Sequence, residues 1–511
     1  MCRSNRFSFL LFSRFNANAG SNIVNLAKRL LQAGVLSPDQ LGQALHSQKK
    51  FRGFLGDHLI ALGLMEPEAL VQFAPPYPPV PGTFEDMGLP ENFLAQLLLK
   101  HAYFTYSFTA REMSEVLKIP EHLVELLIAY LMQQKYLDVS PRDLLHPSPG
   151  HMAAEMRYIL SGSGKNNAGE LLEFNSYVGP APVSLEDYWD WVEVQTVQQV
   201  EITAERLRAA FKDYVVPESL FNELRPAIAS GRSIFLFGPS GNGKTALARC
   251  IGEVFDDPVY IPYALYVQGQ IMRIYDEFIH EPAAPAPDAP RYDTRWVRCR
   301  RPLVIAGGEM TDAALEPKYN PVSKYYEAPH QIQANNGLFI IDDFGRQKIS
   351  PQQLLNRWMF PLESRQDFCS LHTGQQFAVP FDQLIIFCTN LDPYALADEA
   401  FLRRIRHKVY IGDVSEAQFL EILRRACKQY SLIFDPTLVQ AMVQRYYVEP
   451  SRPFRACHPR DLIENLIDRA RAFGQLPQLT SQNIDLACQS YFIKSRGTVD
   501  YDKVADKEDT R

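Results

Sequence analysis

The sequence predicts a multidomain protein: helical N-terminal modules, then an α/β domain built on a mostly parallel sheet, then a helical lid. Its 511 residues leave room for about three or four domains. From about residue 200 onward, short apolar strands alternate with helices, which is typical of parallel α/β domains. The apolar fraction of 46% and the charged fraction of 22% are ordinary for folded globular protein.

Composition and charge exclude several classes of protein. No apolar run approaches the roughly 18 residues of a membrane helix, so we expect no membrane span. The net charge of −7 disfavours general binding to nucleic acid. The eight cysteines form no C-x-x-C pair, which argues against a zinc site and a dense disulfide scaffold and favours a reducing, cytoplasmic location.

The N-terminal segment 1–22 contains three arginines and no acidic residue. It lacks the long apolar region and cleavage site of a signal peptide. We expect a flexible N-terminus here, and a transit peptide is the alternative interpretation.

Residues 23–73 contain an internal repeat with an offset of 29 residues. The repeated positions are Leu30, Gly34, Pro38 and Leu41, which recur as Leu59, Gly63, Pro67 and Leu70. Each copy predicts a helix that ends at the glycine and a second helix that starts near the proline. Two helical hairpins should result.

This repeat resembles the N-terminal domain of type II secretion and type IV pilus ATPases. Some members of that family bind cyclic di-GMP through an Arg-Leu-Gly start to each repeat. Here the two starts read Asn25-Leu-Ala27 and Phe54-Leu55-Gly56, so both arginines are absent. Their absence removes the bidentate partners of guanine or phosphate and favours a protein-docking module over cyclic di-GMP binding.

A Pro-rich linker at 74–90 leads to a winged-helix-like domain at 91–178. The expected helices are 92–101, one starting at Thr109, 121–135 and one starting at Asn167; the expected strands are 136–140 and 156–160. The third helix carries one Lys against two Glu and no Arg. DNA readers need basic residues there, so a protein-contact or packing role is favoured, with DNA reading as the alternative.

The strongest local signal is a glycine-rich loop between the apolar strand 233–237 and a helix at 246–254. Such a loop turns successive backbone N–H groups inward around phosphate, and the helix N-terminus adds the positive end of its dipole. We therefore predict an ATP site in which Lys244 reaches the β- and γ-phosphates and Thr245 ligates Mg²⁺. The expected nucleotide-binding residues are Gly238, Pro239, Ser240, Gly241, Asn242, Gly243, Lys244, Thr245 and Ala246.

Two later strands end in polar side chains. The strand at 337–341 is followed by Asp342 and Asp343, and the strand at 384–389 by Asn390. Carboxyl ends of parallel strands form the edge at which open α/β sheets bind ligands. We expect Asp342 to hold Mg²⁺ through water, Asp343 to polarise the attacking water, and Asn390 to orient it.

The order of these motifs, followed by Leu402-Arg403-Arg404-Ile405 and a helical lid, resembles the AAA+ ATPases over roughly residues 200–490. The resemblance implies Walker A at 238–245, Walker B at Asp342 and Asp343, sensor 1 at Asn390, arginine fingers at Arg403 and Arg404, and sensor 2 at Arg460. Many members have Asp-Glu at Walker B. The Asp-Asp pair found here also occurs in initiator and helicase-loader branches.

The resemblance divides this part of the chain into an ATPase core at 200–412, a lid at 413–492 and a tail at 493–511 that we expect to be disordered. It implies a homo-oligomer, usually a hexameric ring, because arginine fingers act on a neighbouring subunit. Our leading hypothesis is an ATP-hydrolysing, chaperone-like remodelling ATPase whose protein client the sequence does not name. The alternatives are an ATP-switched, DNA-associated loader or regulator and a secretion- or pilus-linked regulatory ATPase.

Three further features of the sequence have structural interpretations. Four arginines at 295–301 should lie on a solvated strand edge. Aromatic residues at 319–330 fit a substrate-gripping loop and ordinary packing equally well. The Pro-rich run 281–290 should be a surface insertion.

Overall fold

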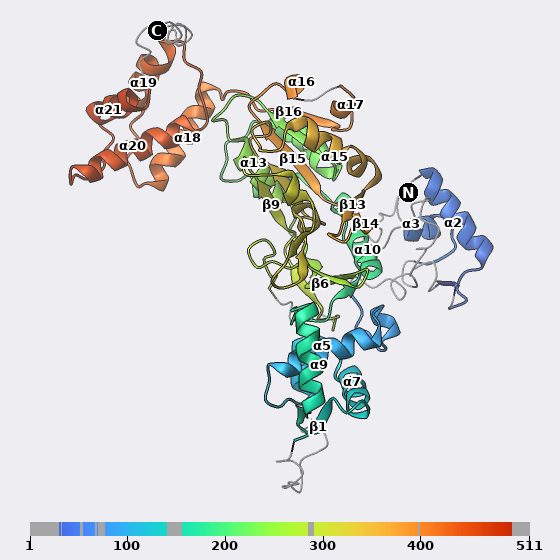
Figure 1. The fold of residues 1–511 in the computed structure, drawn as a ribbon. Helices are drawn as coiled ribbons and strands as arrows, with labels where there is room; N and C mark the ends of the chain where they lie inside the picture. Colours follow the sequence, from blue (N-terminus) through green and yellow to red (C-terminus); the bar gives the residue numbers. More distant parts are fainter. Residues whose placement is uncertain are drawn as a thin grey trace, which may run out of the picture.

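The computed structural model describes residues 30–31, 33–51, 55–66, 69, 77–140, 156–284, 291–396 and 399–492. The segments 1–22 and 493–511, most of the Pro-rich run 281–290, and Pro67 lie outside these residues. Figure 1 shows an elongated arrangement, with the winged-helix-like domain at one end, the α/β core at the other and the lid beside the core. Within the described part of the chain, none of the helices has the length and apolarity to span a bilayer.

The N-terminal repeat ends its helical turns at the two predicted glycines. Gly34 and Gly63 have φ of +67° and +66°. The N–H groups that follow them donate to Leu30 O at 3.0 Å and to Leu59 O at 2.9 Å, so both copies close in the same way. The helices of this part are α2 (Pro38–Phe51) and α3 (Leu55–Ala61).

The winged-helix-like domain follows the predicted order of helices and strands. Its elements are η1 (Glu85–Met87), α5 (Glu91–Tyr103), α6 (Ala110–Leu117), α7 (Glu121–Gln133), β1 (Leu137–Val139), β2 (Tyr158–Leu160) and α9 (Gly162–Phe174). Thr109 and Glu112 form a capping box at the start of α6. Strands β1 and β2 pair antiparallel.

The start of α9 differs from the prediction: it lies at Gly162 and not at Asn167. The Ser161 side chain caps the helix by accepting from Gly164 N at 3.0 Å. Gly164 also passes so close to the backbone that a Cβ atom there would lie 2.1 Å from Tyr136 O. Glycine at 164 therefore allows the start of the helix to approach the backbone before β1 closely.

The α/β core contains a five-stranded parallel sheet in the order β16-β4-β15-β12-β9. The strands are β4 (Ile234–Phe237), β9 (Leu303–Ala306), β12 (Leu338–Ile341), β15 (Leu384–Thr389) and β16 (His407–Tyr410). The helices are α11 (Ala204–Ala210), α12 (Glu218–Ala229), α13 (Lys244–Gly252), α15 (Pro351–Ser364), α16 (Pro393–Leu396) and α17 (Glu399–Leu402). This mixed architecture with a parallel sheet is the fold class that the sequence predicted for the core.

Helices cover both faces of this sheet. Ile234 and Leu236 pack with apolar residues of α11, α12 and α13, whereas Phe235 faces the other way and packs with α15 residues such as Trp358. Strands β12 and β15 are buried along their whole length. The continuous apolar runs of these strands follow from burial on both faces.

A second five-stranded sheet, which we call the inserted sheet, is a feature that the sequence analysis did not predict. Its order is β10-β11-β7-β6-β3, with both parallel and antiparallel pairs. It is formed by β3 (Val183–Ser184), β6 (Ala264–Val267), β7 (Gln270–Arg273), β10 (Lys318–Asn320) and β11 (Tyr325–Glu327). Most of it interrupts the core between α13 and β12, and Figure 1 shows it between the core and the winged-helix-like domain.

Smaller elements surround the inserted sheet. They are α10 (Leu185–Val194), η3 (Val197–Gln199), the pair β5 (Val259–Pro262) and β8 (Trp296–Cys299), η4 (Asp312–Leu315), α14 (His330–Gln333), and the hairpin β13 (Gln366–Ser370) and β14 (Gln376–Pro380). The Trp189 indole on α10 donates to Ala378 O at 3.2 Å. The hairpin therefore joins the core to α10 and the inserted sheet.

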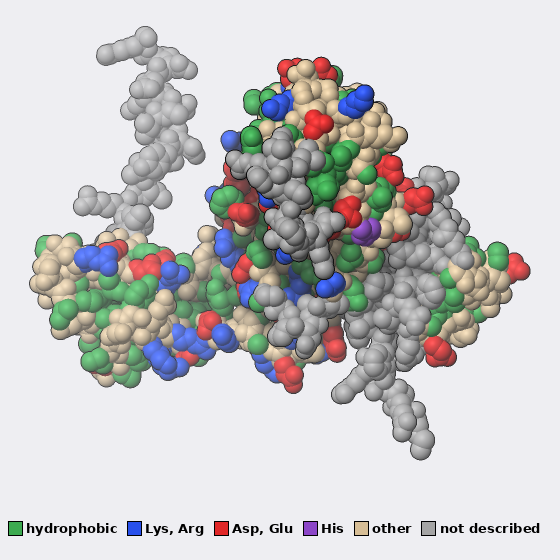
Figure 2. Space-filling view, turned by 90° about the horizontal axis from the view of Figure 1, so that it is seen from below, with side chains coloured by type: hydrophobic (Ala, Val, Ile, Leu, Met, Phe, Trp, Pro, Cys, Tyr) green, Lys and Arg blue, Asp and Glu red, His purple; other side chains and the backbone are tan. Residues whose placement is uncertain are grey.

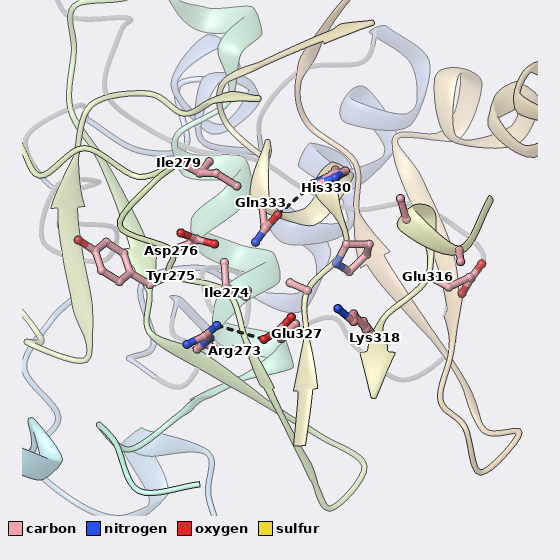
Figure 3. A pocket seen from close by; sticks show the side chains of 14 residues that line it. Arg273, Ile274, Tyr275, Asp276, Ile279, Glu316, Lys318, Glu327, His330 and Gln333 are labelled. Carbon is pink, nitrogen blue, oxygen red and sulfur yellow. Dashed lines mark hydrogen bonds and ion pairs between the residues drawn. The ribbon is translucent and has the colours of Figure 1, made fainter. Parts of the chain in front are cut away.

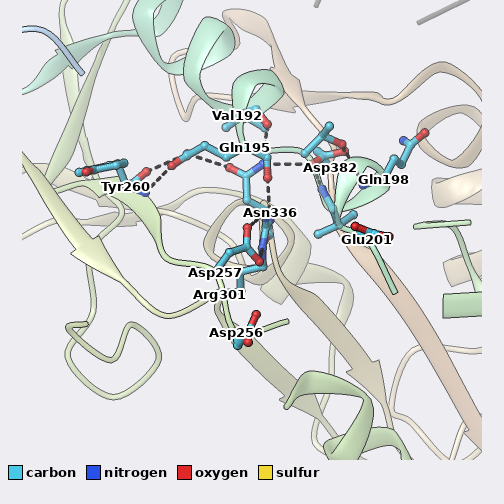
Figure 4. Close-up of polar contacts among 12 residues, drawn as sticks. Val192, Gln195, Gln198, Glu201, Asp256, Asp257, Tyr260, Arg301, Asn336 and Asp382 are labelled. Atoms are coloured by element: carbon cyan, nitrogen blue, oxygen red, sulfur yellow. Dashed lines mark hydrogen bonds and ion pairs between the residues drawn. The ribbon is translucent and has the colours of Figure 1, made fainter. Parts of the chain in front are cut away.

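A buried polar cluster, which we call the amino-edge clamp, fixes the connection between α10 and the core (Figure 4). The Arg301 guanidinium donates to Gln195 O at 2.6 Å and to Asn336 O at 2.7 Å, and it pairs with Asp257 at 2.6 Å. The Asp382 carboxylate accepts from the Thr196 hydroxyl at 2.7 Å. The clamp lies at the amino ends of β9, β12 and β15, opposite the edge that carries the predicted site.

The expectation of a solvated strand edge at 295–301 is wrong for two of its four arginines. The Arg295 side chain is 3% exposed and pairs with Asp293 at 2.7 Å. The Arg301 side chain is also 3% exposed. Both guanidiniums are buried because each has an acidic partner and donates to backbone carbonyls of distant segments, Pro182 O for Arg295 and Gln195 O for Arg301. Sequence spacing does not reveal these carbonyls.

The lid contains α18 (Glu416–Gln429), α19 (Pro436–Val443), η5 (Gln444–Val448), α20 (His458–Ala472) and α21 (Ser481–Tyr491). Its core is formed by apolar residues from all of these helices, including Phe419, Val439, Tyr447, Leu462 and Ile484. The lid is thus a helical unit with its own core, attached to the sheet through β16.

Candidate functional site

The glycine-rich loop joins β4 to α13 and wraps around the N-terminus of that helix. Gly238 has φ of +141°, and a Cβ atom there would lie 2.3 Å from Ile411 O. Gly241 has φ of +83°, and a Cβ atom there would lie 2.7 Å from Cys457 Sγ. Only glycine fits these two positions, because the backbone is left-handed and β16 and the lid crowd against it.

Lys244 is the first residue of α13 and is buried inside the loop. Its Nζ donates to Gly238 O and to Pro239 O, both at 2.9 Å. Burial lowers the pKa of Lys244 below its ordinary value, while the neighbouring Asp343 and other acidic groups oppose that change. The ammonium therefore lies within the turn where the phosphates of a nucleotide would lie.

The structure brings together two residues that lie 97 positions apart in the sequence. The Thr245 hydroxyl donates to Asp342 Oδ1 at 2.7 Å. Strand β15 lies between β4 and β12 in the sheet, so the loop after β4 and the acidic end of β12 meet across one intervening strand. A hydroxyl and a carboxylate are the hard oxygen ligands that suit Mg²⁺, so this pair fits the ion that the sequence predicted.

Asp343 is the next residue, and it adopts a left-handed backbone with φ of +49°. This conformation is uncommon for a residue other than glycine and directs the chain away from the line of β12. Phe344 N donates to Cys388 O at 2.7 Å, and the Thr389 hydroxyl donates to Phe344 O at 2.7 Å. The acidic turn is thereby fixed to the end of β15, and half-buried Asn390 follows directly.

Sequence reasoning missed Gln347, which supports the acidic turn. Its side-chain amide donates to Asp342 O at 2.7 Å and accepts from Gly345 N at 2.9 Å. Both contacts lie within five residues of Asp342. An amide side chain shortly after a strand-ending carboxylate is therefore the sequence feature from which this role of Gln347 could have been predicted.

The structure also points to Arg455, a lid residue that sequence reasoning missed. Its guanidinium donates to Ser240 O in the glycine-rich loop and lies 3.6 Å from the Asp413 carboxylate. Asn242 donates to Asp413 Oδ1 at 2.8 Å, and Cys457 N donates to Gly241 O at 2.9 Å. The lid therefore contacts the glycine-rich loop directly, and Arg455 is the positively charged lid residue at this contact.

Arg460, the predicted sensor 2 residue, lies elsewhere on the lid. Its side chain is 66% exposed and pairs with Glu464 at 2.7 Å, one turn along α20. The Tyr430 hydroxyl donates to the same carboxylate at 2.6 Å. Arg455 lies just before the N-terminus of α20, and this end of the helix contacts the glycine-rich loop. Its position before the helix was the sequence feature from which Arg455 could have been predicted.

The two predicted arginine fingers have different environments. Arg404 pairs with Glu363 on α15 at 2.7 Å, within its own chain. Arg403 is exposed at the end of α17. Of the two, Arg403 is the one whose side chain faces solvent, where a neighbouring subunit would meet it.

The aromatic residues at 319–330 pack inside the protein. Tyr326 is fully buried, and its hydroxyl bonds to the His372 ring. Tyr319 stacks on His372 with ring centroids 4.0 Å apart, and Tyr325 packs edge-on against Tyr177 at 5.5 Å. Packing explains these aromatic residues. Across the described ranges, no cluster of His, Cys, Asp and Glu suited to a metal ion is found, which includes the Cys457-His458 pair.

Comparison with known proteins finds one matching family and many similar solved structures. A family described as "Domain of unknown function (DUF8689)" matches residues 415–490, within the lid. No curated protein matches the chain in sequence. Among solved structures, NtrX from Brucella abortus in complex with ADP is 16% identical with a TM-score of 0.35; the match covers 59% of this chain and 61% of NtrX.

Two other solved structures are similar at the same level. Domain III of the replication initiation protein DnaA from Thermotoga maritima is 12% identical with a TM-score of 0.32, over 58% of this chain and 100% of that one. A point mutant of RuvB from Thermotoga maritima is 12% identical with a TM-score of 0.29, over 61% of this chain and 76% of that one. These likenesses do not establish a family or an activity for this chain, so the site rests on its own geometry.

Proposed function

We propose that this protein binds and hydrolyses ATP as an AAA+ ATPase. The observation that carries the proposal is the 2.7 Å contact between Thr245 and Asp342, which joins the glycine-rich loop to the acidic end of β12. A nucleoside triphosphate needs both a cradle of backbone N–H groups and a carboxylate for its cation. The sheet order β4-β15-β12 supports the proposal, because the loop after β4 and the acidic end of β12 meet across one intervening strand.

Each residue of the site then has a defined task. The loop amides and Lys244 bind the phosphates, and Thr245 and Asp342 would hold Mg²⁺, which neutralises phosphate charge when bound. Asp343 accepts a proton from the attacking water, and Asn390 orients that water. Arg455 reaches the loop from the lid. It would couple the position of the lid to bound phosphates, because a guanidinium binds phosphate strongly.

The test is Lys244→Ala. We expect it to reduce ATP hydrolysis to background and to weaken ATP binding, because the variant lacks the buried cation of the loop. Phosphate release and the binding of a fluorescent ATP analogue measure the two effects. Lys428→Met, which removes an exposed lysine from the lid, is the matched control. Undiminished hydrolysis in Lys244→Ala would overturn the proposed site.

We further propose that the protein is a homo-oligomeric remodelling ATPase acting on a protein client. Exposed Arg403 supports the oligomer, because a finger must project from its own subunit to reach a neighbour. The helical repeat and the winged-helix-like domain supply surfaces for protein contact. A hexameric ring is the arrangement that we expect for the assembly.

The charges of the winged-helix-like domain disfavour the alternative function, a DNA-associated loader. Residues 91–140 and 156–178 contain eight acidic and six basic side chains. Helix α7 exposes Leu126 and Tyr130 alongside glutamates. Figure 2 shows basic and acidic side chains interspersed on the described surface of the face drawn. DNA binding depends on a basic surface, which this pattern does not supply.

A further inference from the structure

A cavity of about 330 Å³ lies away from the ATP site, between the inserted sheet and the segment that leads into β12 (Figure 3). Its walls come from β7, β10, β11, η4, α14 and the turn at 275–279. The volume falls within the roughly 300–1,000 Å³ that is typical of ligand sites. None of the residues assigned above to ATP lines it.

One wall of the cavity presents a hydrogen-bond donor without a protein partner. Gln333 is only 9% exposed, and its Oε1 lies 3.3 Å from His330 Nδ1. Its Nε2 has no partner among the described residues, and Figure 3 shows it directed into the cavity. The amide N–H groups are therefore open to the cavity and are suited to donate to a ligand carbonyl.

Charged groups of both signs lie around this donor. Arg273 and Glu327 pair with each other at 3.2 Å, and Glu316 pairs with Arg357 at 3.2 Å. Lys318 has no ionic partner among the described residues and lies across the cavity from Asp276 in Figure 3. A ligand that fits these groups carries an acidic group near Lys318 and a basic group near Asp276.

A rigid turn beside the cavity displays a fully exposed aromatic ring. Phe278 is 100% exposed and lies between Asp276 and Ile279, which both line the cavity. Phe278 N donates to Asp276 Oδ1 at 2.9 Å, and His280 N donates to Asp276 O at 2.8 Å.

The same turn is anchored in the interior by a histidine. His280 is fully buried, accepts from Asp276 N at 2.9 Å and bonds to Gln333 O at 2.9 Å. Burial lowers the pKa of His280, which keeps the ring neutral and allows one nitrogen to accept while the other donates. The backbone of the turn is therefore fixed, and the exposed Phe278 ring beside the cavity is suited to contact an apolar side chain of a partner.

We propose that this cavity is a binding site for a short polypeptide segment that carries both an acidic and a basic side chain. Gln333 Nε2 donates to a peptide carbonyl, Lys318 pairs with the acidic group, Asp276 pairs with the basic group, and Phe278 packs against an apolar side chain. This proposal rests on the proposed function in one respect: it assigns the contact with the protein client to this cavity. Peptide binding itself requires no ATP hydrolysis.

The position of the cavity connects a bound peptide to the ATP site. Helix α14 contributes His330 and Gln333, and the chain passes from it through Asn335 and Asn336 directly into β12. Strand β12 ends at Ile341, and Asp342 follows directly. A peptide held by α14 therefore contacts the segment that positions the acidic end of the strand.

The experiment is a fluorescence anisotropy titration of the full chain without nucleotide. The probes are fluorescein-labelled, terminally blocked heptapeptides with a central Leu, one Lys and one Glu at varied spacing; matched probes have Gln in place of Lys and Glu. We expect the charged probes to bind and the Gln probes to bind more weakly. Gln333→Leu, Lys318→Met, Asp276→Asn and Phe278→Ala should each weaken binding about fivefold or more, which is a typical loss for an interface contact.

Two lid variants serve as controls, since they remove similar exposed side chains far from the cavity. Phe473→Ala and Lys428→Met should leave peptide affinity unchanged. If no probe binds up to about 1 mM, or if the cavity variants bind as the unaltered chain does, the peptide site is refuted. A chain that binds peptide without hydrolysing ATP overturns the ATPase proposal alone, and a chain that hydrolyses ATP without binding peptide overturns this one alone.

Discussion

At the proposed ATP site, two adjacent aspartates have different environments, which suit them to different tasks. Asp342 is fixed by Thr245, and its backbone carbonyl accepts from Gln347. Asp343 is exposed at the same edge and adopts a left-handed backbone. The first carboxylate is placed to hold a cation near the phosphates, and the second is free to take a proton from water.

Asp343→Asn should separate ATP binding from hydrolysis. Asparagine tolerates the left-handed backbone, so the turn should keep its shape, while the amide cannot accept the proton. We expect hydrolysis to fall by roughly 100-fold or more and ATP affinity to stay within about twofold. Single-turnover hydrolysis and equilibrium binding measure the two quantities. Asp342→Asn is the contrasting variant, because it should weaken binding that depends on Mg²⁺.

His458 gives the lid a defined dependence on pH. Burial, with a contribution from nearby Arg455, lowers the pKa of His458 from 6.5 to about 4. The folded lid therefore binds the proton less well than the unfolded lid does, and its stability falls as the pH drops from about 6.5 to about 4. We expect the melting temperature to fall over this range and the fall to be smaller in His458→Gln. Thermal melts between about pH 7 and pH 4 test this, and equal slopes for both proteins would contradict it.

At the scale of the elements, the amino-edge clamp connects the core to the segment that follows α10. Asp382 is 6% exposed and binds Thr196, Val197 N and Asn336. It also lies 3.4 Å from the Arg365 guanidinium. This one carboxylate satisfies donors from the connector after α10, from the segment before β12 and from the end of α15.

Asp382→Ala should loosen the connector without unfolding the ATP site directly. Truncating the carboxylate removes the acceptor of the Thr196 hydroxyl and the ionic partner of Arg365, which keeps its hydrogen bond to Gly231 O at 2.8 Å. The loss of these contacts should cost about 1–3 kcal/mol. We expect faster amide hydrogen exchange at residues 195–200 and a lower midpoint in urea. Glu363→Ala, which removes the exposed partner of Arg404, is a control with a smaller expected effect. Unchanged exchange at 195–200 would show that the clamp does not hold the connector.

The inserted sheet shows why the sequence pattern predicted only some of the strands. The sequence predicted β15 at its observed bounds and β4 and β12 within one residue, because apolar runs between polar ends mark buried strands. The short strands β3, β10 and β11 have two or three residues each. Strands β3 and β11 pair with β6 and β7, which lie far away in the chain. So few residues carry too little periodicity to predict a strand.

At the scale of the whole molecule, the proposed ATP site draws on the core and the lid, and we propose that a neighbouring subunit completes it. Arg455 and Cys457 reach the glycine-rich loop from the lid. Exposed Arg403 is the candidate contribution to the next subunit's site. Hydrolysis should therefore depend on assembly.

Arg403→Ala should test this dependence through mixing of subunits. Alone, it should bind ATP normally and lose hydrolysis roughly thousandfold, as for other arginine fingers. Lys244→Ala alone should also be inactive. A mixture of the two should recover activity, because some interfaces then pair an intact loop with an intact Arg403. Phosphate release across mixing ratios measures the recovery. No recovery at any ratio, in assemblies shown to exchange subunits, would contradict the shared site.

The sequence by itself determined the features that depend on neighbouring residues. The glycine-rich loop, the strands that end in Asp342, Asp343 and Asn390, and the left-handed turns at Gly34 and Gly63 follow from short-range hydrogen bonding and backbone sterics. Tertiary structure alone decided that Thr245 meets Asp342, that Arg455 rather than Arg460 contacts the loop, and that Arg301 is buried. These pairings join residues distant in the chain, and burial selects them only when the whole molecule packs.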